Sequence, residues 1–274
     1  MKPQRNSHLK TFAKAGLMAG AVITLAHVAT LDRRVVYTEV PFVSPRVPRE
    51  LDGYTIALVT DTHGISQKRL GGVVDTLNAK QVDLLLLGGD YAEAEPKLQA
   101  TMSLLSQVQA TDGIFGVAGN HDTAETLFPI MAANHITPLA NSGRYLRDRF
   151  YLAGLEDGKR QNPDIKKATA AAAAESFVLL LSHQPDVCMR QDTAHVDLML
   201  CGHTHGGHVT LFGLWAPALP LATLYGRRFR NGWATSRDKM PVFVSRGVGE
   251  TLPRIFARPQ VVLVRLCCQS EESP

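Results

Sequence analysis

The chain has 274 residues, of which 45% are hydrophobic and 20% are charged, enough for one large globular domain with a substantial core. The formal net charge is only +4 and no basic strip with interleaved aromatic residues is present, so we expect no nucleic-acid partner; acidic small molecules or membrane headgroups are the expected partners. The four cysteines have no zinc-type spacing, and their positions do not indicate a disulfide framework.

The N-terminal region differs in character from the rest of the chain. A basic segment over residues 1–14 precedes an uncharged apolar run over 15–31. This run is close to the minimum length of a membrane-spanning helix and also fits the core of a signal peptide, whereas its lack of a polar face argues against a soluble amphipathic helix. Because no convincing cleavage site follows, we expect an uncleaved transmembrane or signal-anchor helix.

Basic residues flank the expected anchor on both sides. Four precede it and Arg33 and Arg34 follow it, so the positive-inside tendency places the domain on the outer face of a bacterial inner membrane, with the cytoplasmic face as the alternative. Residues 32–51 contain three prolines and are expected to form an extended linker. The expected domain covers 52–268, and a short tail covers 269–274.

Strands and helices alternate in the first half of this domain. Apolar runs predict strands over 54–59, 82–87 and 114–117, and apolar stripes with helical spacing predict a helix after each. Each strand ends in a short polar motif: Asp61-Thr62-His63, Gly88-Gly89-Asp90 and Gly119-Asn120-His121-Asp122. Open α/β sheets bind ligands at the carboxyl ends of their strands, so we expect these motifs to converge.

The second half predicts a second sheet. The expected strands cover 150–155, 177–181, 196–201, 241–245 and 261–266, with a surface helix over 165–175. Two of these strands end in Ser182-His183 and in Gly202-His203-Thr204-His205-Gly206-Gly207. The expected fold class is therefore α/β (α+β), with two sheets packed face to face, helices on their outer sides and all five motifs at one rim.

The motifs supply a mixed set of nitrogen and oxygen donors. The candidate metal ligands are Asp61, His63, Asp90, Asn120, His183, His203 and His205. Seven donors are too many for one tetrahedral ion, but with one bridging carboxylate they suit two divalent ions about 3.5–4 Å apart, with manganese, zinc and iron all acceptable. Such a pair attracts phosphate, activates water and polarises phosphoryl oxygens.

A proton donor for the leaving group is also available. His121, beside Asp122, can donate a proton to a leaving alkoxide if the carboxylate orients the ring. The alternatives for His121 are a further metal ligand or a capping residue.

These motifs, in this order, resemble those of the calcineurin-like metallophosphoesterase superfamily. The Gly202–Gly207 motif, together with Ser182-His183-Gln184-Pro185-Asp186 and Ser245-Arg246-Gly247-Val248-Gly249, is similar to its YkuE/YaeI-type branch of membrane-associated bacterial phosphodiesterases. The resemblance implies a four-layer αββα sandwich over about residues 52–266. His208 stands where a glutamine is expected in this branch, and we assign it no role.

The resemblance also implies a role for each ligand. Asp61, His63 and His205 would hold one ion, Asn120, His183 and His203 the other, and Asp90 would bridge the two. His121 would act on the substrate or its leaving group, with Asp122 in support.

The segment after the last motif supplies candidate substrate contacts. An apolar, proline-containing loop over 211–221 includes Trp215 and precedes Arg227 and Arg228. It could receive an acyl chain and a phosphorylated headgroup at a membrane, or instead fold onto the core with its arginines in solvent. Arg246 is a further candidate phosphate contact; the alternative is a buried stem with a carbonyl-bound head.

Three functions are compatible with these residues. The first is a phosphodiesterase or pyrophosphohydrolase acting at the membrane, on a phospholipid or a UDP-diacylglucosamine-type lipid intermediate. The second is a phosphomonoesterase or phosphoprotein phosphatase, and the third is a non-catalytic metal-binding scaffold. No ligand position is replaced in this chain, which favours the enzymes.

Overall fold

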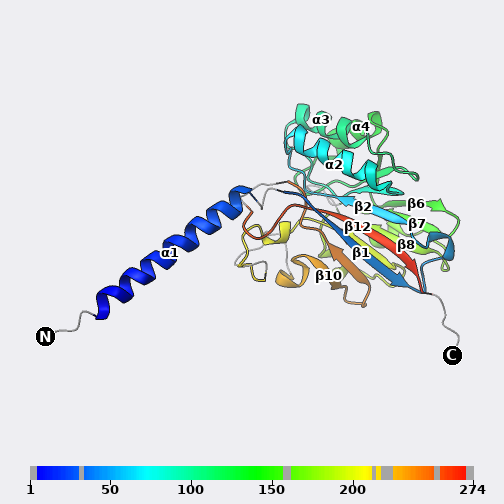
Figure 1. Ribbon diagram of the computed structural model, residues 1–274. Helices are drawn as coiled ribbons and strands as arrows, with labels where there is room; N and C mark the ends of the chain where they lie inside the picture. Colours follow the sequence, from blue (N-terminus) through cyan, green and yellow to red (C-terminus); the bar gives the residue numbers. More distant parts are fainter. Residues whose placement is uncertain are drawn as a thin grey trace.

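The computed structural model describes residues 5–30, 34–156, 162–211, 214–216, 225–249 and 254–269. Two mixed sheets pack face to face, and helices cover their outer faces (Figure 1). This is the layered α/β arrangement expected from the alternation of apolar runs and helical stripes.

The first sheet has the strand order β1-β12-β2-β3-β4-β5. Its strands are β1 (Val36–Ser44), β2 (Thr55–Val59), β3 (Leu84–Leu87), β4 (Ile114–Gly116), β5 (Thr137–Pro138) and β12 (Gln260–Cys268). All neighbours are parallel except β12 and β2. Its outer face is covered by α2 (Gln67–Lys80), α3 (Glu95–Leu105) and α4 (Ala124–Ala133).

The second sheet has the strand order β10-β11-β9-β8-β7-β6. Its strands are β6 (Ser142–Arg147), β7 (Phe150–Gly154), β8 (Phe177–Leu181), β9 (Leu198–Cys201), β10 (Gly232–Thr235) and β11 (Pro241–Val244). Two short helices, α5 (Ile165–Ala168) and α6 (Val187–Arg190), pack on its outer face. The helix expected over 165–175 therefore ends at Ala168. Single 3₁₀ turns occupy η1 (Arg49–Leu51), η2 (His205–Gly207) and η3 (Gly226–Phe229).

The central strands are apolar on consecutive residues because both of their faces are covered. In β3, Leu85 and Leu87 pack against the helices, whereas Leu84 and Leu86 pack between the two sheets. Successive side chains of a strand point to opposite faces, so all four leucines are fully buried. The rigid core therefore fixes the strand ends from which the polar motifs leave.

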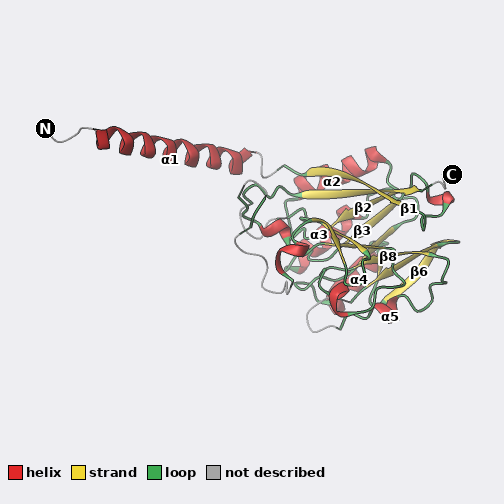
Figure 2. Ribbon diagram, turned by 90° about the horizontal axis from the view of Figure 1, so that it is seen from below, coloured by secondary structure: helices red, strands yellow, loops and turns green. Residues whose placement is uncertain are grey.

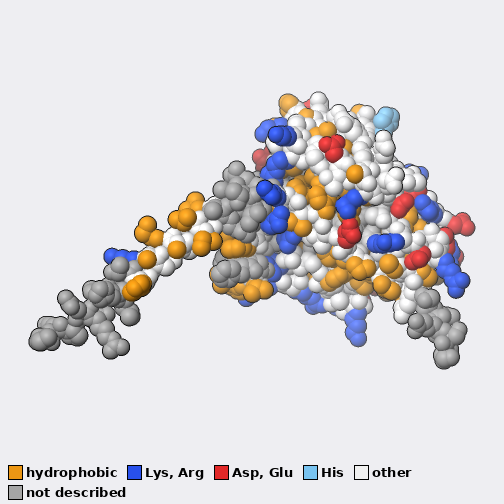
Figure 3. Space-filling model, in the orientation of Figure 1, with side chains coloured by type: hydrophobic (Ala, Val, Ile, Leu, Met, Phe, Trp, Pro, Cys, Tyr) orange, Lys and Arg blue, Asp and Glu red, His pale blue; other side chains and the backbone are white. Residues whose placement is uncertain are grey.

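Helix α1 (Arg5–Thr30) extends away from the sheets (Figure 2). Several of its apolar side chains are exposed, Leu17 and Ile23 among them (Figure 3). Among the residues that the structure describes, no helix combines the length and apolarity needed to cross a bilayer, so the anchor expected over 15–31 is not confirmed.

The segment expected to be a linker contains an ordered strand. Residues 36–44 form β1, which pairs in parallel with β12 along its whole length, so the first sheet begins inside the expected 32–51 linker. Residues 1–4 and 270–274, which belong to the expected basic segment and tail, lie outside the described residues.

Candidate metal centre

All five polar motifs lie at one rim of the sandwich. Strands β2, β3 and β4 are parallel, as are β8 and β9, and each is followed directly by one of the motifs. The carboxyl ends of parallel strands meet at the same edge of a sheet, so the loops that follow them are neighbours. The side chains of the motifs form two groups of potential metal ligands.

The first group consists of Asp61, His63 and His205, whose ligand atoms all lie within 4.8 Å of one another. Nε2 of His205 is 3.2 Å from Nε2 of His63 and 3.5 Å from Oδ1 of Asp61. All three side chains come from loops that were expected to share one ion.

The second group consists of Asp90, His183 and His203. Nε2 of His183 is 3.3 Å from Oδ2 of Asp90, 3.2 Å from Nδ1 of His203 and 2.9 Å from Oδ1 of Asn120. Oδ2 of Asp90 also lies 3.7 Å from Nε2 of His63, in the first group. Asp90 is therefore the side chain that joins the two groups, at the position expected of a bridging ligand.

The protonation states of the histidines fit cation binding. Nδ1 of His183 is 2.8 Å from the carbonyl oxygen of Gly88; a carbonyl only accepts, so Nδ1 carries the proton and Nε2 faces the group with a lone pair. Burial lowers the pKa of His63 to about 4 and that of His203 to about 3, so both rings are neutral near pH 7. Neutral imidazoles gathered with carboxylates into two groups fit a pair of divalent cations.

Most of the candidate ligands have a positive φ angle, a backbone conformation that residues other than glycine rarely adopt. The φ angle is positive at five of the seven candidate ligands: Asp61 (53°), His63 (43°), Asp90 (57°), His203 (73°) and His205 (51°). Each such residue costs on the order of 1–3 kcal/mol and persists only where the surrounding structure determines it. Backbone hydrogen bonds do so here, for example from the amide of Asp61 to the oxygen of Gly89 at 2.9 Å.

Two glycines of the motifs, Gly89 and Gly202, lie so close to neighbouring ligand loops that no side chain fits there. Gly89 has a φ of 94°, and a Cβ there would lie 2.6 Å from the amide nitrogen of Gly119 and 2.8 Å from Nδ1 of His183. A Cβ at Gly202 would collide with a carboxylate oxygen of Asp61. Glycine therefore allows the ligand loops to approach one another closely.

His121 lies exposed at the edge of the first group. Its ring centroid is 5.5 Å from that of His63. Its Nδ1 is 3.7 Å from Oε1 of the exposed Glu93, which is longer than a hydrogen bond. Sequence reasoning did not identify Glu93, because a single acidic residue in the loop before a helix carries no distinguishing signal.

Among the described residues, the carboxylate of Asp122, which we expected to orient His121, makes no hydrogen bond to the ring of that histidine. The buried carboxylate instead accepts hydrogen bonds from the backbone amides of Asp90 (2.7 Å), Gly119 (2.8 Å) and Tyr91 (3.1 Å). Burial, followed by the nearby charge of Asp90, raises the pKa of Asp122 to about 6. The side chain therefore holds together the loop of Asp90 and the loop that carries Asn120 and His121.

We expect Asp122→Asn to destabilise the metal-free protein by roughly 1.5–3 kcal/mol, because a buried, charged acceptor of three amides is replaced by a neutral one. Urea unfolding in the presence of a chelator measures this change. The matched control is Glu93→Gln, which should leave the unfolding midpoint unchanged because Glu93 is exposed. Unchanged stability in Asp122→Asn together with reduced turnover would support the catalytic role instead.

Arg254 is a fully buried residue that sequence reasoning missed, with 2% of its side chain exposed. It donates to the carbonyl oxygens of Gly249 (2.6 and 3.0 Å), Arg246 (2.8 Å), Ala257 (3.0 Å) and His205 (3.2 Å). Its Nη2 also lies 3.3 Å from Nδ1 of His205. A lone arginine in an irregular segment has no periodicity or spacing that would indicate such a position.

Of the candidate substrate contacts, Arg246 lies on a ligand loop, whereas Arg228 and Arg227 contact other parts of the chain. Arg246 packs on the ligand loop, where a Cβ at Gly206 would lie 2.8 Å from its Cγ. Arg228 instead donates to the carbonyl oxygen of Thr235 at 2.8 Å, so β10 holds its guanidinium. Arg227 lies over the ring of the partly exposed Trp215, with its Cζ 4.9 Å from the ring centroid.

Part of this region lies outside the described residues. Of the apolar loop expected over 211–221, the structure describes 211 and 214–216. His208, to which we assigned no role, stacks on His205 with its ring centroid 4.4 Å away.

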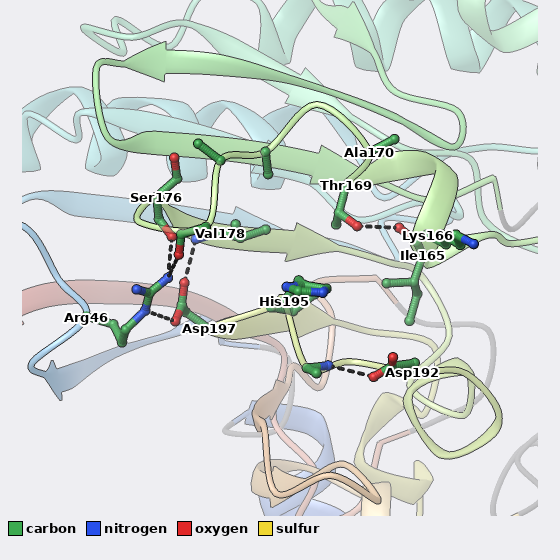
Figure 4. A pocket seen from close by; sticks show the side chains of 15 residues that line it. Arg46, Ile165, Lys166, Thr169, Ala170, Ser176, Val178, Asp192, His195 and Asp197 are labelled. Atoms are coloured by element: carbon green, nitrogen blue, oxygen red, sulfur yellow. Dashed lines mark hydrogen bonds and ion pairs between the residues drawn. The ribbon is translucent and has the colours of Figure 1, made fainter.

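Arg46, Ser176 and Asp197 are among the residues that line a cavity of about 560 Å³ (Figure 4). Ser176 and Asp197 directly precede β8 and β9, so the cavity opens at the amino ends of strands whose carboxyl ends carry the ligands. The guanidinium of Arg46 donates to Asp197 at 2.9 Å and to the carbonyl oxygen of Ser176 at 2.6 Å. None of the described lining residues is a candidate metal ligand.

Comparison with known proteins agrees with this geometry. The sequence model of the calcineurin-like phosphoesterase family matches residues 54–207, a range that contains all seven candidate ligands. The chain is 28% identical over 245 residues to the uncharacterized metallophosphoesterase YkuE of Bacillus subtilis (strain 168), covering 84% of each chain. It is 32% identical over 243 residues to an uncharacterized metallophosphoesterase of Helicobacter pylori (strain ATCC 700392 / 26695), covering 83% of this chain and 63% of the relative.

A vertebrate relative has a longer chain. The protein is 27% identical over 239 residues to the Danio rerio "Transmembrane protein with metallophosphoesterase domain", covering 79% of this chain and 53% of that relative. The chain therefore spans less than two thirds of the length of this relative and of the Helicobacter pylori protein.

Proposed function

Since the chain belongs to the calcineurin-like phosphoesterase family and is thus a hydrolase of phosphoester bonds, we propose that it is a two-metal phosphodiesterase or pyrophosphohydrolase acting at a membrane. The observation that carries the two-metal proposal is the pair of ligand groups joined by Asp90. Two divalent ions, when bound, would supply positive charge to the phosphoryl oxygens and make water nucleophilic near neutral pH.

The residues of the chain would then position the substrate and move a proton. The seven ligands would hold two cations at the rim, and the positive charge of these cations would attract the phosphoryl group. His121, exposed beside His63, would donate a proton to the leaving oxygen, and the carboxylate of Glu93 lies near its ring. Asp122 would keep the loops of Asp90 and His121 in register through its backbone hydrogen bonds.

Exposed apolar side chains beside the metal centre support a lipid-linked substrate. The loop that follows the last ligand motif exposes Val209 (40%), Leu211 (59%), Leu214 (83%) and Trp215 (42%). Apolar residues gathered next to a charged site are typical of surfaces that meet a lipid or a partner protein. We therefore propose as substrate a phospholipid or a UDP-diacylglucosamine-type lipid intermediate.

The proposed location rests on the apolar run of α1 and the basic residues on either side of it. The apolar run of α1 would attach the domain to a bacterial inner membrane, with the domain on its outer face. The name of the Danio rerio relative, "Transmembrane protein with metallophosphoesterase domain", is compatible with this proposal.

We expect Leu214→Ser and Trp215→Ser to reduce hydrolysis of a lipid substrate in vesicles by roughly 10- to 100-fold, since each removes about 1.5–3 kcal/mol of apolar burial. Turnover of the small diester bis(p-nitrophenyl) phosphate should not change, because it has no acyl chain. Val43→Ser is the matched control, since Val43 is 59% exposed on the edge strand β1. Equal losses on both substrates with a lower melting temperature would show that the loop serves packing instead.

The reaction class can be tested with purified full-length protein. With manganese, turnover of bis(p-nitrophenyl) phosphate exceeding that of p-nitrophenyl phosphate would support the diesterase. Preference for the monoester would favour a phosphatase, and no turnover with manganese, zinc or iron would favour a metal-binding scaffold. Mass spectrometry of a treated lipid extract would then identify the product.

A further inference from the structure

Arg230, Arg246 and Arg258, from three separate segments, lie beside the last ligand loop. Arg246 follows β11 and covers Gly206, with its Cγ 2.8 Å and its Cδ 2.9 Å from where a Cβ of that glycine would be. The carbonyl oxygen of Arg230 accepts a hydrogen bond from the hydroxyl of Thr204 at 2.6 Å. Both arginines are therefore attached to the loop that carries two candidate metal ligands.

Backbone contacts hold Arg258 close to Arg246. The single guanidinium of Arg254 donates to the carbonyl oxygens of Arg246 (2.8 Å) and Ala257 (3.0 Å), and Ala257 directly precedes Arg258. The same two segments meet again where the amide of Arg246 donates to Oε1 of Gln260 at 3.1 Å. The arginines are thus positioned by their backbones, independently of any ligand.

Two of these arginines, Arg246 and Arg258, each have a buried side-chain nitrogen, Nε, that makes no hydrogen bond in the described part of the chain. Burial lowers the pKa of Arg246, and the positive charges of Arg258 and Arg230 lower it further, because the three charges lie near one another. A buried N–H donor without an acceptor is costly, so two such donors on neighbouring arginines are expected where an anion accepts from them.

We propose that Arg246 and Arg258, with Arg230 beside them, bind a second phosphate group of the substrate, next to the phosphoryl group that is hydrolysed. The planar guanidinium fork matches phosphate oxygens and donates two parallel hydrogen bonds to them. This inference rests on the proposed function, because it assigns part of the substrate of the same site. The second phosphate belongs either to a diphosphate linkage or to a lipid headgroup.

Calorimetric titration of the chelated full-length protein with inorganic phosphate tests the cluster without the metal ions. One phosphate should bind per chain, and Arg246→Gln and Arg258→Gln should each weaken binding at least about tenfold. Arg258→Lys retains the positive charge but not the planar guanidinium, so it should weaken phosphate binding less than Arg258→Gln does. It replaces Arg258→Gln in the test if that variant does not fold. Arg237→Gln is the control, because Arg237 is exposed and pairs with Asp238.

Absence of phosphate binding by the chelated wild-type protein, or equal binding by all variants, would overturn the inference. Manganese-dependent turnover of bis(p-nitrophenyl) phosphate, measured in parallel, reports on the proposed function separately. Turnover without phosphate binding overturns only the inference, whereas arginine-dependent binding without turnover supports the cluster and contradicts the hydrolase.

Competition then identifies the source of the second phosphate. Displacement of inorganic phosphate by a soluble nucleoside diphosphate supports a diphosphate-linked substrate. Displacement only by vesicles that contain phosphatidylglycerol supports a lipid headgroup.

Discussion

Asp90→Asn should leave the protein with fewer than two divalent ions per chain and lower diester turnover at least about 100-fold. Mutation of a residue that merely orients a metal ligand typically lowers activity about 10- to 100-fold, and loss of the ligand itself should lower it at least as much. Asp90 is the side chain that reaches both ligand groups, with Oδ2 3.3 Å from Nε2 of His183 and 3.7 Å from Nε2 of His63. Asparagine offers one neutral oxygen in its place, so two cations would face each other with less negative charge between them.

Metal analysis after remetallation, together with turnover of bis(p-nitrophenyl) phosphate, measures this effect. Asparagine can still accept the backbone hydrogen bond that Oδ1 of Asp90 receives from His121 at 2.8 Å, so the loop should remain folded. Asp75→Asn, an exposed change on α2, is the matched control and should retain both ions. Two ions and wild-type turnover in Asp90→Asn would contradict the binuclear centre.

Arg254→Met should destabilise the protein by at least about 3 kcal/mol, because it leaves several buried carbonyl oxygens without a donor, at about 1–3 kcal/mol each. The methionine keeps an apolar stem but cannot donate to Gly249, His205 or Ala257. Since the oxygen of His205 is one of these acceptors, the ligand loop should also shift and metal affinity should fall. The predicted effect is therefore on both stability and metal content.

Urea unfolding with and without a chelator separates the two effects of Arg254→Met. Loss of stability in the chelated protein reports the missing hydrogen bonds, and a smaller stabilisation by added manganese reports weaker metal binding. Arg254→Lys has three donors and should recover part of the stability. Arg265→Met, at an exposed position of β12, should behave as wild type. Wild-type stability and metal content in Arg254→Met would contradict a positioning role.

The convergence of the ligands could be predicted from the sequence because it depends on a local pattern. Asp61, Asp90 and His183 each follow a short, continuously apolar run, and such runs form buried parallel strands whose carboxyl ends share one edge. The linker prediction over 32–51 rested on three prolines in that segment and was wrong for residues 36–44, which form β1 and include Pro41. An edge strand tolerates proline, since only one side of it needs to pair.

The sequence by itself determined which donors are present and at which strand ends they lie, because the order of apolar runs and polar motifs is written along the chain. Only the tertiary structure decided that Asp122 turns toward backbone amides and that Arg254 holds the loop of His205, 49 residues away. A buried side chain takes its direction from unpaired groups on segments distant in sequence. Those groups come within reach only after the two sheets have packed together.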